Sequence, residues 1–250
     1  MSSAVDTGFG FHAVPSVPQY SAGVYASPGY EIVRYRFTEE VPVSEAFDRV
    51  EELLVSQNLP TTSVCAFELR SPAPFTEEGF AAFNKLYNGR LEKWGLLEPG
   101  YNPVSRSNVC PKNNPPSETV VYAFSIVRPT ESQRKTFVVA GSGEVPEGKP
   151  NYHDHIVALG DTSPEGMRTK ARWVIEEMSN RLQLLGVTWT DVCDANVYTV
   201  HEYLHIMDSE LPIRTNLAYA WVYAKPPIVG LDYEMDCRAV AADYFLEVTK

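Results

Sequence analysis

Residues 164–186, PEGMRTKARWVIEEMSNRLQLLG, contain the clearest helical pattern in this chain of 250 residues. Apolar side chains recur there every three or four residues, which places one apolar stripe along a helix: Ala171, Val174, Ile175, Met178, Leu182 and Leu185. Gly186 follows the last apolar position and predicts the end of the helix, because glycine readily adopts the left-handed conformation of a helix stop. The segment therefore predicts a long helix that buries one face.

Strand-like runs lie on both sides of this helix. We predict strands over Lys135–Ala140, His155–Leu159, Cys193–Val200, Leu217–Tyr223 and Tyr233–Ala241. A short second helix is predicted over Glu202–Glu210. The second half of the chain therefore alternates strands and helices in the order strand, helix, strand, helix, strand, strand.

The first half of the chain follows the same order. Its predicted strands include Ser21–Tyr25, Glu31–Phe37, Ser63–Leu69 and Val120–Val127, and its predicted helices are Ser44–Leu54, with Ser44 as the N-cap, and Phe75–Trp94. After the second helix, each half carries an Arg-Ser-Asn or Arg-Thr-Asn triplet that enters a strand, at 106–108 and 214–216. The shared order predicts an internal repeat.

The repeat defines the expected domain organisation. A short polar stretch, Thr130–Arg134, separates the two halves. We therefore expect an irregular N-terminal arm over residues 1–19, rich in Gly, Pro and Ser, and two domains over residues 20–130 and 131–250.

Composition and charge limit the function classes. The chain holds 32 acidic and 21 basic residues, a formal net charge of -11, which argues against binding to nucleic acid or to an anionic membrane surface. No apolar run approaches the roughly 18 residues of a membrane span, and the N-terminus lacks a signal-peptide pattern. The four cysteines are scattered without CxxC spacing, so we expect free thiols in a cytoplasmic protein.

Five segments of the second half resemble the Rid/YjgF family of imine and enamine deaminases, and together they span nearly all of residues 135–242. They are Phe137–Gly143, Thr169–Val192, Asn196–Tyr198, Pro212–Thr215 and Tyr233–Ala241. The first half resembles a more diverged member through Tyr20-Ser21, Phe80–Leu91 and Arg106. The chain as a whole is similar to a fused pair of such domains, of the 2-aminomuconate deaminase kind.

This resemblance implies an α+β fold with two tandem Rid/YjgF-like (chorismate-mutase-like) domains. Each would be a mixed β-sheet covered on one face by two helices. The family's domains form trimers with pockets between neighbours, so the resemblance implies a homo-oligomer, a trimer of two-domain chains. Because the two halves retain complementary motifs, one pocket shared between them is also expected.

The resemblance further implies a hydrolytic deaminase that needs no cofactor and no metal. Its substrate would be a small enamine or imine carboxylate, either of the 2-aminomuconate type or a 2-imino acid, and aromatic catabolism is the expected setting. Such hydrolysis needs an anchored carboxylate, a positioned water and stabilisation of the tetrahedral intermediate.

The resemblance assigns substrate binding to six residues: Arg214, Arg106, Gly141, Ser142, Asn84 and Tyr20. The two arginines match the family's carboxylate-binding arginine, since a planar guanidinium holds a carboxylate through two hydrogen bonds. A glycine at 141 permits close approach of the backbone to a ligand.

The acidic group that assists the water is expected on the last strand. Glu234, Asp236 and Arg238 share one face there by strand alternation. The family's usual acidic position aligns with Arg238, which is a departure from the family pattern. Asp236 and Glu234 are therefore the candidate catalytic acids.

Two other functions stay open at this point. The same pocket would serve a non-catalytic metabolite-binding protein. Residues 201–205, HEYLH, match the HExxH pattern of zinc hydrolases, in which His201 and His205 bind the metal and Glu202 acts as base. A third ligand is missing from any recognised downstream pattern, which favours a surface helix instead.

Overall fold

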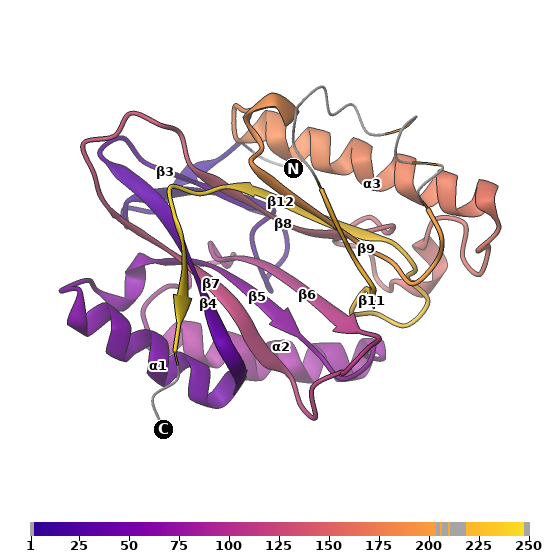
Figure 1. Ribbon diagram of the computed structural model, residues 1–250, viewed down its shortest axis with the longest axis horizontal. Helices are drawn as coiled ribbons and strands as arrows, with labels where there is room; N and C mark the ends of the chain where they lie inside the picture. The colour runs from indigo at the N-terminus through magenta and orange to yellow at the C-terminus, as the bar shows by residue number, and fades with distance from the viewer. Residues whose placement is uncertain (1–2, 204–205, 207–209, 211–218, 248–250) are drawn as a thin grey trace.

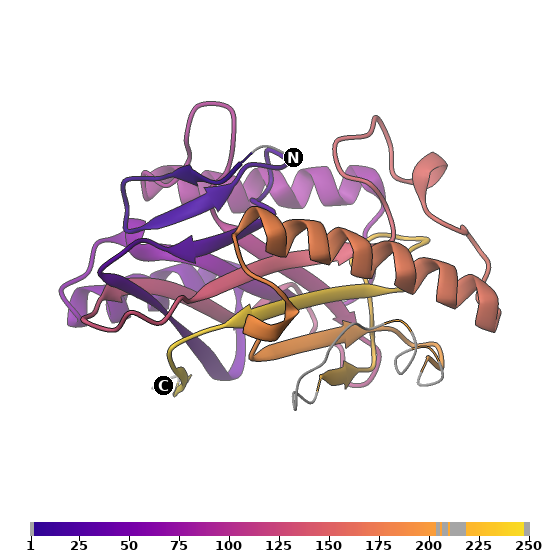
Figure 2. The same cartoon turned by 90° about the horizontal axis from the view of Figure 1, so that it is seen from above.

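Two β-sheets pack face to face in the middle of the protein, and helices cover their outer faces (Figure 1). The computed structural model describes residues 3–203, 206, 210 and 219–247. Helix α3 (Pro164–Leu184) lies on one sheet, whereas α1 (Val43–Ser56) and α2 (Glu77–Lys93) lie on the other (Figures 1 and 2). The layers therefore run helix, sheet, sheet, helices, which is an α+β arrangement.

The first sheet has the strand order β1-β2-β3-β8-β12-β9-β10. Its strands are β1 (Val5–Asp6), β2 (Phe11–Val14), β3 (Gly23–Ala26), β8 (Phe137–Gly143), β12 (Glu234–Ala239), β9 (Asp194–Tyr198) and β10 (Ala220–Val222). All neighbours pair antiparallel except β9 and β10, which are parallel. The sheet is therefore mixed.

The second sheet has the order β11-β6-β5-β7-β4-β13. Its strands are β11 (Ala224–Lys225), β6 (Ser105–Pro111), β5 (Val64–Arg70), β7 (Val120–Pro129), β4 (Tyr30–Pro42) and β13 (Asp243–Leu246). Strand β6 is parallel to β5, and β13 is parallel to β4. This sheet is mixed as well, as the sequence predicted.

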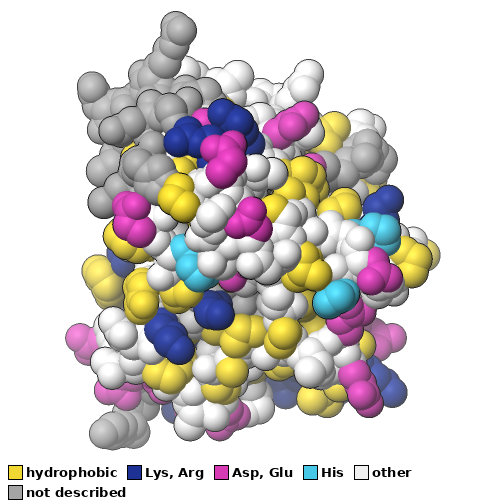
Figure 3. Space-filling model, turned by 90° about the vertical axis from the view of Figure 1, so that its right-hand side faces the viewer, with side chains coloured by type: hydrophobic (Ala, Val, Ile, Leu, Met, Phe, Trp, Pro, Cys, Tyr) yellow, Lys and Arg dark blue, Asp and Glu magenta, His cyan; other side chains and the backbone are white. Residues whose placement is uncertain are grey.

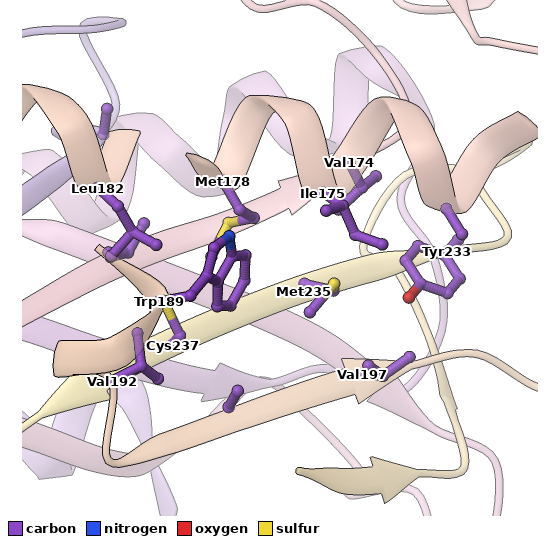
Figure 4. Close-up of a cluster of buried hydrophobic side chains, with 14 of the residues drawn as sticks. Val174, Ile175, Met178, Leu182, Trp189, Val192, Val197, Tyr233, Met235 and Cys237 are labelled. Carbon is purple, nitrogen blue, oxygen red and sulfur yellow. The ribbon is translucent and has the colours of Figure 1, made fainter. Parts of the chain in front are cut away.

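The long helix α3 confirms the strongest sequence prediction. The Ser163 hydroxyl caps its first turn by accepting a hydrogen bond from the backbone N–H of Gly166, and Gly186 beyond its end has a φ of 66°. The predicted apolar stripe packs on β12 and β9, where Met235, Cys237 and Val197 face it (Figure 4). One buried face therefore fixes the helix to the first sheet.

Helices α1 and α2 bury their apolar faces on the second sheet. Their core is rich in aromatic rings: Phe47, Phe67, Tyr87, Trp94 and Phe124. The predicted N-cap of α1 is wrong, because the helix begins at Val43 and Pro42 precedes it without a capping side chain. A proline at this position has a φ near that of a helix and cannot cap.

Two other local predictions are corrected by the structure. The irregular arm predicted over residues 1–19 is not observed in residues 3–19, because β1 and β2 lie within them and β2 pairs with β3. His155–Leu159 is not a strand: His153–His155 is a 3₁₀ helix, and turns follow in which Ala158 and Gly160 have positive φ. Short apolar runs do not distinguish a strand from a buried turn.

The two predicted halves exchange strands. Strand β3 belongs to the first half by sequence but pairs with β8, whereas β11 and β13 belong to the second half and pair with β6 and β4. The division into domains at residues 20–130 and 131–250 stays a prediction. Of the predicted helix Glu202–Glu210, residues 202 and 203 are not helical, 206 and 210 are helical, and the rest lie outside the described residues.

The surface carries charges of both signs. On the face shown in Figure 3, basic and acidic side chains of the described residues lie among hydrophobic ones. None of the helices in the described part of the chain combines the length and the apolar character that a membrane crossing needs. The arginines with the most specific surroundings are buried between the layers, and they lead to the candidate site.

Candidate functional site

A cavity lies beside strand β6, where the two sheets meet. Residues 20, 80 and 106–108 line it from the first half of the chain, and residues 141–143, 145, 147, 152, 227–228, 231 and 234 line it from the second. All of these residues belong to one chain. The expected pocket between the two halves is therefore formed within a single molecule.

The cavity exists because the outer edge of β6 is only partly covered. Ser21 bridges to Ser105 at one end of the strand, and β11 pairs with Cys110 and Pro111 at the other. Between these points, no strand in the described part of the chain pairs with the outer edge of β6. Residues 106–108 thus border the cavity next to the end of β8.

Arg106 is a buried cation that has no acidic partner among the described residues. Its side chain is 3% exposed, and both terminal nitrogens are buried without a hydrogen bond. No carboxylate of the described residues lies within 4 Å of it. Its guanidinium carbon instead lies 4.8–5.8 Å from the centres of four aromatic rings: Tyr20, Phe80, Phe83 and Tyr87.

The electrostatics of Arg106 favour an anionic ligand. Burial lowers the pKa of the Arg106 guanidinium, yet an arginine stays protonated in proteins. A charge taken out of water without a partner is strongly unfavourable, and a carboxylate bound through two hydrogen bonds would neutralise it. The cavity beside β6 is therefore suited to a carboxylate.

Glu234, the first residue of β12, supplies an acidic group to the same cavity. It is 3% exposed, and burial, reinforced by Asp236 and Glu144, raises the pKa of its carboxyl well above the ordinary value. Gly141 makes room for this carboxyl, since a Cβ there would lie 2.2 Å from Oε1 of Glu234. A carboxylic acid that keeps its proton can serve as a general acid.

Arg181 of α3 holds the backbone at the end of β8. Its Nη1 donates to the carbonyl oxygens of Ala140 and Gly141, both at 3.3 Å, and its Nη2 donates to Glu147 at 2.8 Å. Glu147 also accepts a hydrogen bond from the Ser16 hydroxyl. The glycine that faces Glu234 is therefore fixed by buried contacts with α3.

Neutral hydrogen-bond donors and an apolar wall complete the lining. The Ser107 hydroxyl and the Asn108 amide nitrogen are buried without partners. Burial raises the pKa of Tyr20 well above its ordinary value, so its phenol keeps its proton. The apolar wall is made of Phe80, Val145, Ile228 and Leu231.

Five predicted site residues meet in this cavity: Tyr20, Arg106, Gly141, Ser142 and Glu234. Asn84 is buried on α2 with neither amide atom hydrogen-bonded, and it is not among the lining residues. Arg214 lies outside the described residues. The predicted substrate-binding roles stay predictions, but most of the predicted residues line this one cavity.

Asp236 lies elsewhere, between the sheets. Its carboxylate accepts hydrogen bonds from Asn196 and Tyr198, both at 2.9 Å, and pairs with Arg238 at 2.9 Å. Its oxygens are therefore occupied by protein groups. The two candidate catalytic acids therefore have different surroundings, and of the two only Glu234 lines the cavity.

Sequence reasoning missed five polar residues at or behind the cavity: Ser107, Asn108, Glu147, Tyr152 and Arg181. The repeated triplet at 106–108 was a signal for the first two. Arg181 was visible as an arginine seven residues after Val174, on the buried face of the predicted helix. Glu147 and Tyr152 come from a loop without periodicity, so no pattern marked them.

The HExxH segment is only partly described. His201 Nε2 lies 3.1 Å from Oδ1 of Asp232, residues 201–203 are not helical, and His205 lies outside the described residues. Among the side chains that the structure describes, no three His, Cys, Asp or Glu residues gather as metal ligands.

Comparisons with known proteins match nearly the whole chain. The family model described as 2-aminomuconate deaminase CnbZ matches residues 4–244. The 2-amino-5-chloromuconate deaminase of Comamonas testosteroni is 46% identical over 241 residues, which cover 95% of this chain and 96% of that protein. This likeness extends over both halves of the chain.

A solved structure with a TM-score above 0.5 shares the fold. A chorismatase has a TM-score of 0.54 at 12% identity, and the match covers 96% of this chain and 80% of that chain. RidA from an Antarctic Psychrobacter species matches 44% of this chain and 84% of its own, with a TM-score of 0.31 and 16% identity.

Proposed function

Because the chain belongs to the 2-aminomuconate deaminase CnbZ family, we propose that it hydrolyses the enamine of a 2-aminomuconate-type substrate and releases ammonia. The deaminase resemblance drawn from the sequence is thereby confirmed at the level of the family. The observation that carries the proposal is one cavity, lined by a buried guanidinium with no acidic partner in the described part of the chain and by a buried carboxyl with a raised pKa.

Arg106 binds a substrate carboxylate in this proposal. Its two terminal nitrogens form a planar fork, and no protein group competes for them in the described part of the chain. Phe80 and the apolar wall contact the hydrocarbon part of the substrate. Binding thus restricts the substrate to one orientation, which contributes to the rate by proximity.

Glu234 moves the protons. In its protonated form it gives a proton to the enamine carbon, which converts the enamine to an iminium ion. The resulting carboxylate then takes a proton from a water that attacks the carbon bearing the nitrogen. Glu234, which now holds the proton from that water, gives it to the amino nitrogen of the tetrahedral amino alcohol. The carbon–nitrogen bond then breaks, and the hydroxyl proton returns to Glu234 as the carbonyl forms, so that one water is consumed for each ammonia that leaves. The reaction needs no redox partner.

The neutral donors support the charged species. The Ser107 hydroxyl and the Tyr20 phenol line the same cavity and can donate to oxygen atoms of the substrate or the intermediate. Both groups already lie in the wall of the cavity before a substrate binds, which favours electrostatic stabilisation with little reorganisation.

The experiment that tests this function is ammonia release from freshly prepared 2-aminomuconate, measured above the spontaneous rate. We expect Glu234→Gln to lower kcat by about 100-fold, since general acid–base catalysis contributes factors of this order. KM should change little, because glutamine keeps the shape of the side chain. Glu92→Gln, on the exposed face of α2, is the matched control and should retain full activity.

The pH profile gives a second readout. A raised pKa keeps Glu234 protonated above the usual range, so kcat/KM should fall as the pH rises through that pKa. Glu234→Gln should lack this limb of the profile. Equal kcat values for the wild type and Glu234→Gln would contradict the role of Glu234. No acceleration by the wild type would favour a metabolite-binding protein instead.

A further inference from the structure

We propose that Asn108 selects dicarboxylate substrates, by donating a hydrogen bond from its amide to the carboxylate that lies farther from Arg106. The inference rests on the proposed function for the class of substrate. It adds a residue that determines specificity at the far end of the cavity.

The orientation of the Asn108 amide is set by its neighbours. The Ser71 hydroxyl donates to Oδ1 of Asn108 at 3.0 Å, and it also contacts the Thr119 hydroxyl at 3.1 Å. With Oδ1 occupied as an acceptor, the amide nitrogen is the free donor. This nitrogen is buried without a partner, and Asn108 lines the cavity at 3% exposure. A buried donor without a partner is unfavourable until a ligand or a water accepts its hydrogen bond.

The spacing of Arg106 and Asn108 matches a short dicarboxylate. The two residues are two positions apart on β6, so their Cα atoms are separated by about 6.6 Å along the strand and their side chains share a face. That face is turned toward α2, where Arg106 contacts the Tyr87 ring. A muconate skeleton has four carbon atoms between its carboxyl carbons, an extended length comparable to this spacing.

The reactive group lies between these two ends. Ser107 points to the opposite face of β6, where its Cβ is 3.1 Å from the position of a Cβ on Gly141. The carboxyl of Glu234 contacts the same glycine. All five residues line the one cavity beside the edge of β6, so a dicarboxylate that spans Arg106 and Asn108 along this edge passes Ser107, which lies between them on the strand.

The far end of the cavity carries no free cation in the described part of the chain. Arg106 is the one arginine in the lining, and Arg181 behind it is paired with Glu147 and Glu177. A neutral amide donor at the far end thus distinguishes a second carboxylate from a methyl group by a hydrogen bond. Loss of that bond should remove the distinction without removing binding at Arg106.

The test uses two ligands that lack the amino group and therefore do not react. Muconate and sorbate share the six-carbon diene skeleton, but sorbate has a methyl group in place of the second carboxylate. We expect the wild type to bind muconate about tenfold more tightly than sorbate in calorimetric titrations, because a hydrogen bond to a charged group contributes on this order.

Asn108→Ala should reduce the muconate-to-sorbate preference to near one, with sorbate affinity nearly unchanged. Asn108→Asp keeps an acceptor for Ser71 but places a negative charge at the far end, so it should reverse the preference. This second variant decides the question if Asn108→Ala does not fold. Asn180→Ala, on the exposed face of α3, is the control and should keep the wild-type preference.

The outcomes separate this inference from the proposed function. An unchanged preference in the Asn108 variants, or no binding of muconate by the wild type, would overturn the role of Asn108, even if ammonia release is observed. An Asn108-dependent preference without ammonia release from 2-aminomuconate would support the dicarboxylate site and refute the deaminase.

Discussion

Two groups of buried arginines in this protein differ in their partners. Arg34 and Arg238, between the sheets, pair with acids: Arg34 donates to both oxygens of Glu68 at 2.6 and 2.7 Å, and Arg238 contacts Asp236 at 2.9 Å. Arg106, beside β6, is equally buried and has no acid within reach in the described part of the chain. A paired arginine belongs to the scaffold, whereas an unpaired one indicates a place for a ligand.

The pKa of Glu68 shows how strongly the paired arginines act on a buried acid. Burial alone would raise the pKa of its carboxyl, but the Arg238 and Arg34 guanidiniums outweigh this effect and lower the pKa to about 2. Glu234 has no such pair, and its pKa is raised. Two buried glutamates between the same layers thus have opposite protonation behaviour, because their neighbours differ.

Exchanging an arginine for methionine should change the free energy of unfolding in opposite directions in the two groups. Arg106→Met is expected to lower kcat/KM on 2-aminomuconate by about 1000-fold, as two charge-assisted hydrogen bonds to the carboxylate are lost. It should also stabilise the fold slightly, since an unpaired buried charge is removed. Arg238→Met should instead lower the free energy of unfolding by about 3–5 kcal/mol, because it leaves buried acids unpaired.

Urea unfolding and steady-state kinetics on both variants measure this contrast. A large loss of stability in Arg106→Met would show that Arg106 serves the scaffold, and the comparison between the two groups would then fail.

The pH dependence of stability sharpens the comparison. The folded-state pKa of Glu68 is depressed, so its stabilisation is present above the ordinary value of 4.5 and is lost as the pH falls toward about 2. We expect about 3 kcal/mol of the unfolding free energy to disappear over this interval. Glu68→Gln should be less stable at neutral pH and should lack most of this dependence. Parallel curves for both proteins would contradict the pairing.

The smallest expected effect concerns Gly141. A methyl group there would lie 2.2 Å from Oε1 of Glu234, a contact that the flexible carboxyl can relieve by moving. Gly141→Ala should therefore fold, and it should lower kcat about tenfold because the proton donor is displaced. Gly89→Ala on α2 meets no atom within 4 Å and is the control; it should keep full activity and gain about 0.5–1 kcal/mol of stability. Unchanged kcat in Gly141→Ala would place the working position of Glu234 elsewhere.

Glu234 and Asp236 illustrate the limit of sequence reasoning about the site. Strand alternation places both on one face of β12, and the sequence gives no reason to prefer either. The tertiary structure separates them, since Tyr198 and Asn196 donate to Asp236 while Glu234 faces the glycine at 141. Tyr198 and Asn196 belong to β9, and Gly141 belongs to β8. These two strands flank β12 in the sheet but are separated from it by different lengths of chain.

The sequence by itself determined most of the regular elements and the family. The apolar stripe of α3, its glycine stop and the Phe137–Gly143 strand are local patterns, and a period of 3.6 or 2 reports the buried face directly. The triplet at 106–108 was equally visible, although only its arginine was predicted as a site residue, and all three of its residues line the cavity.

Only the tertiary structure decided which residues are partners. Strands β3, β11 and β13 pair with the sheet of the other half, and the donors that fix Gly141 and Asn108 come from residues 40 and 37 positions away. Pairing across such separations depends on how the whole chain packs, and no local period records it. The sequence therefore predicts an arginine suited to a carboxylate, but its lack of an acidic partner becomes visible only when both sheets are in place.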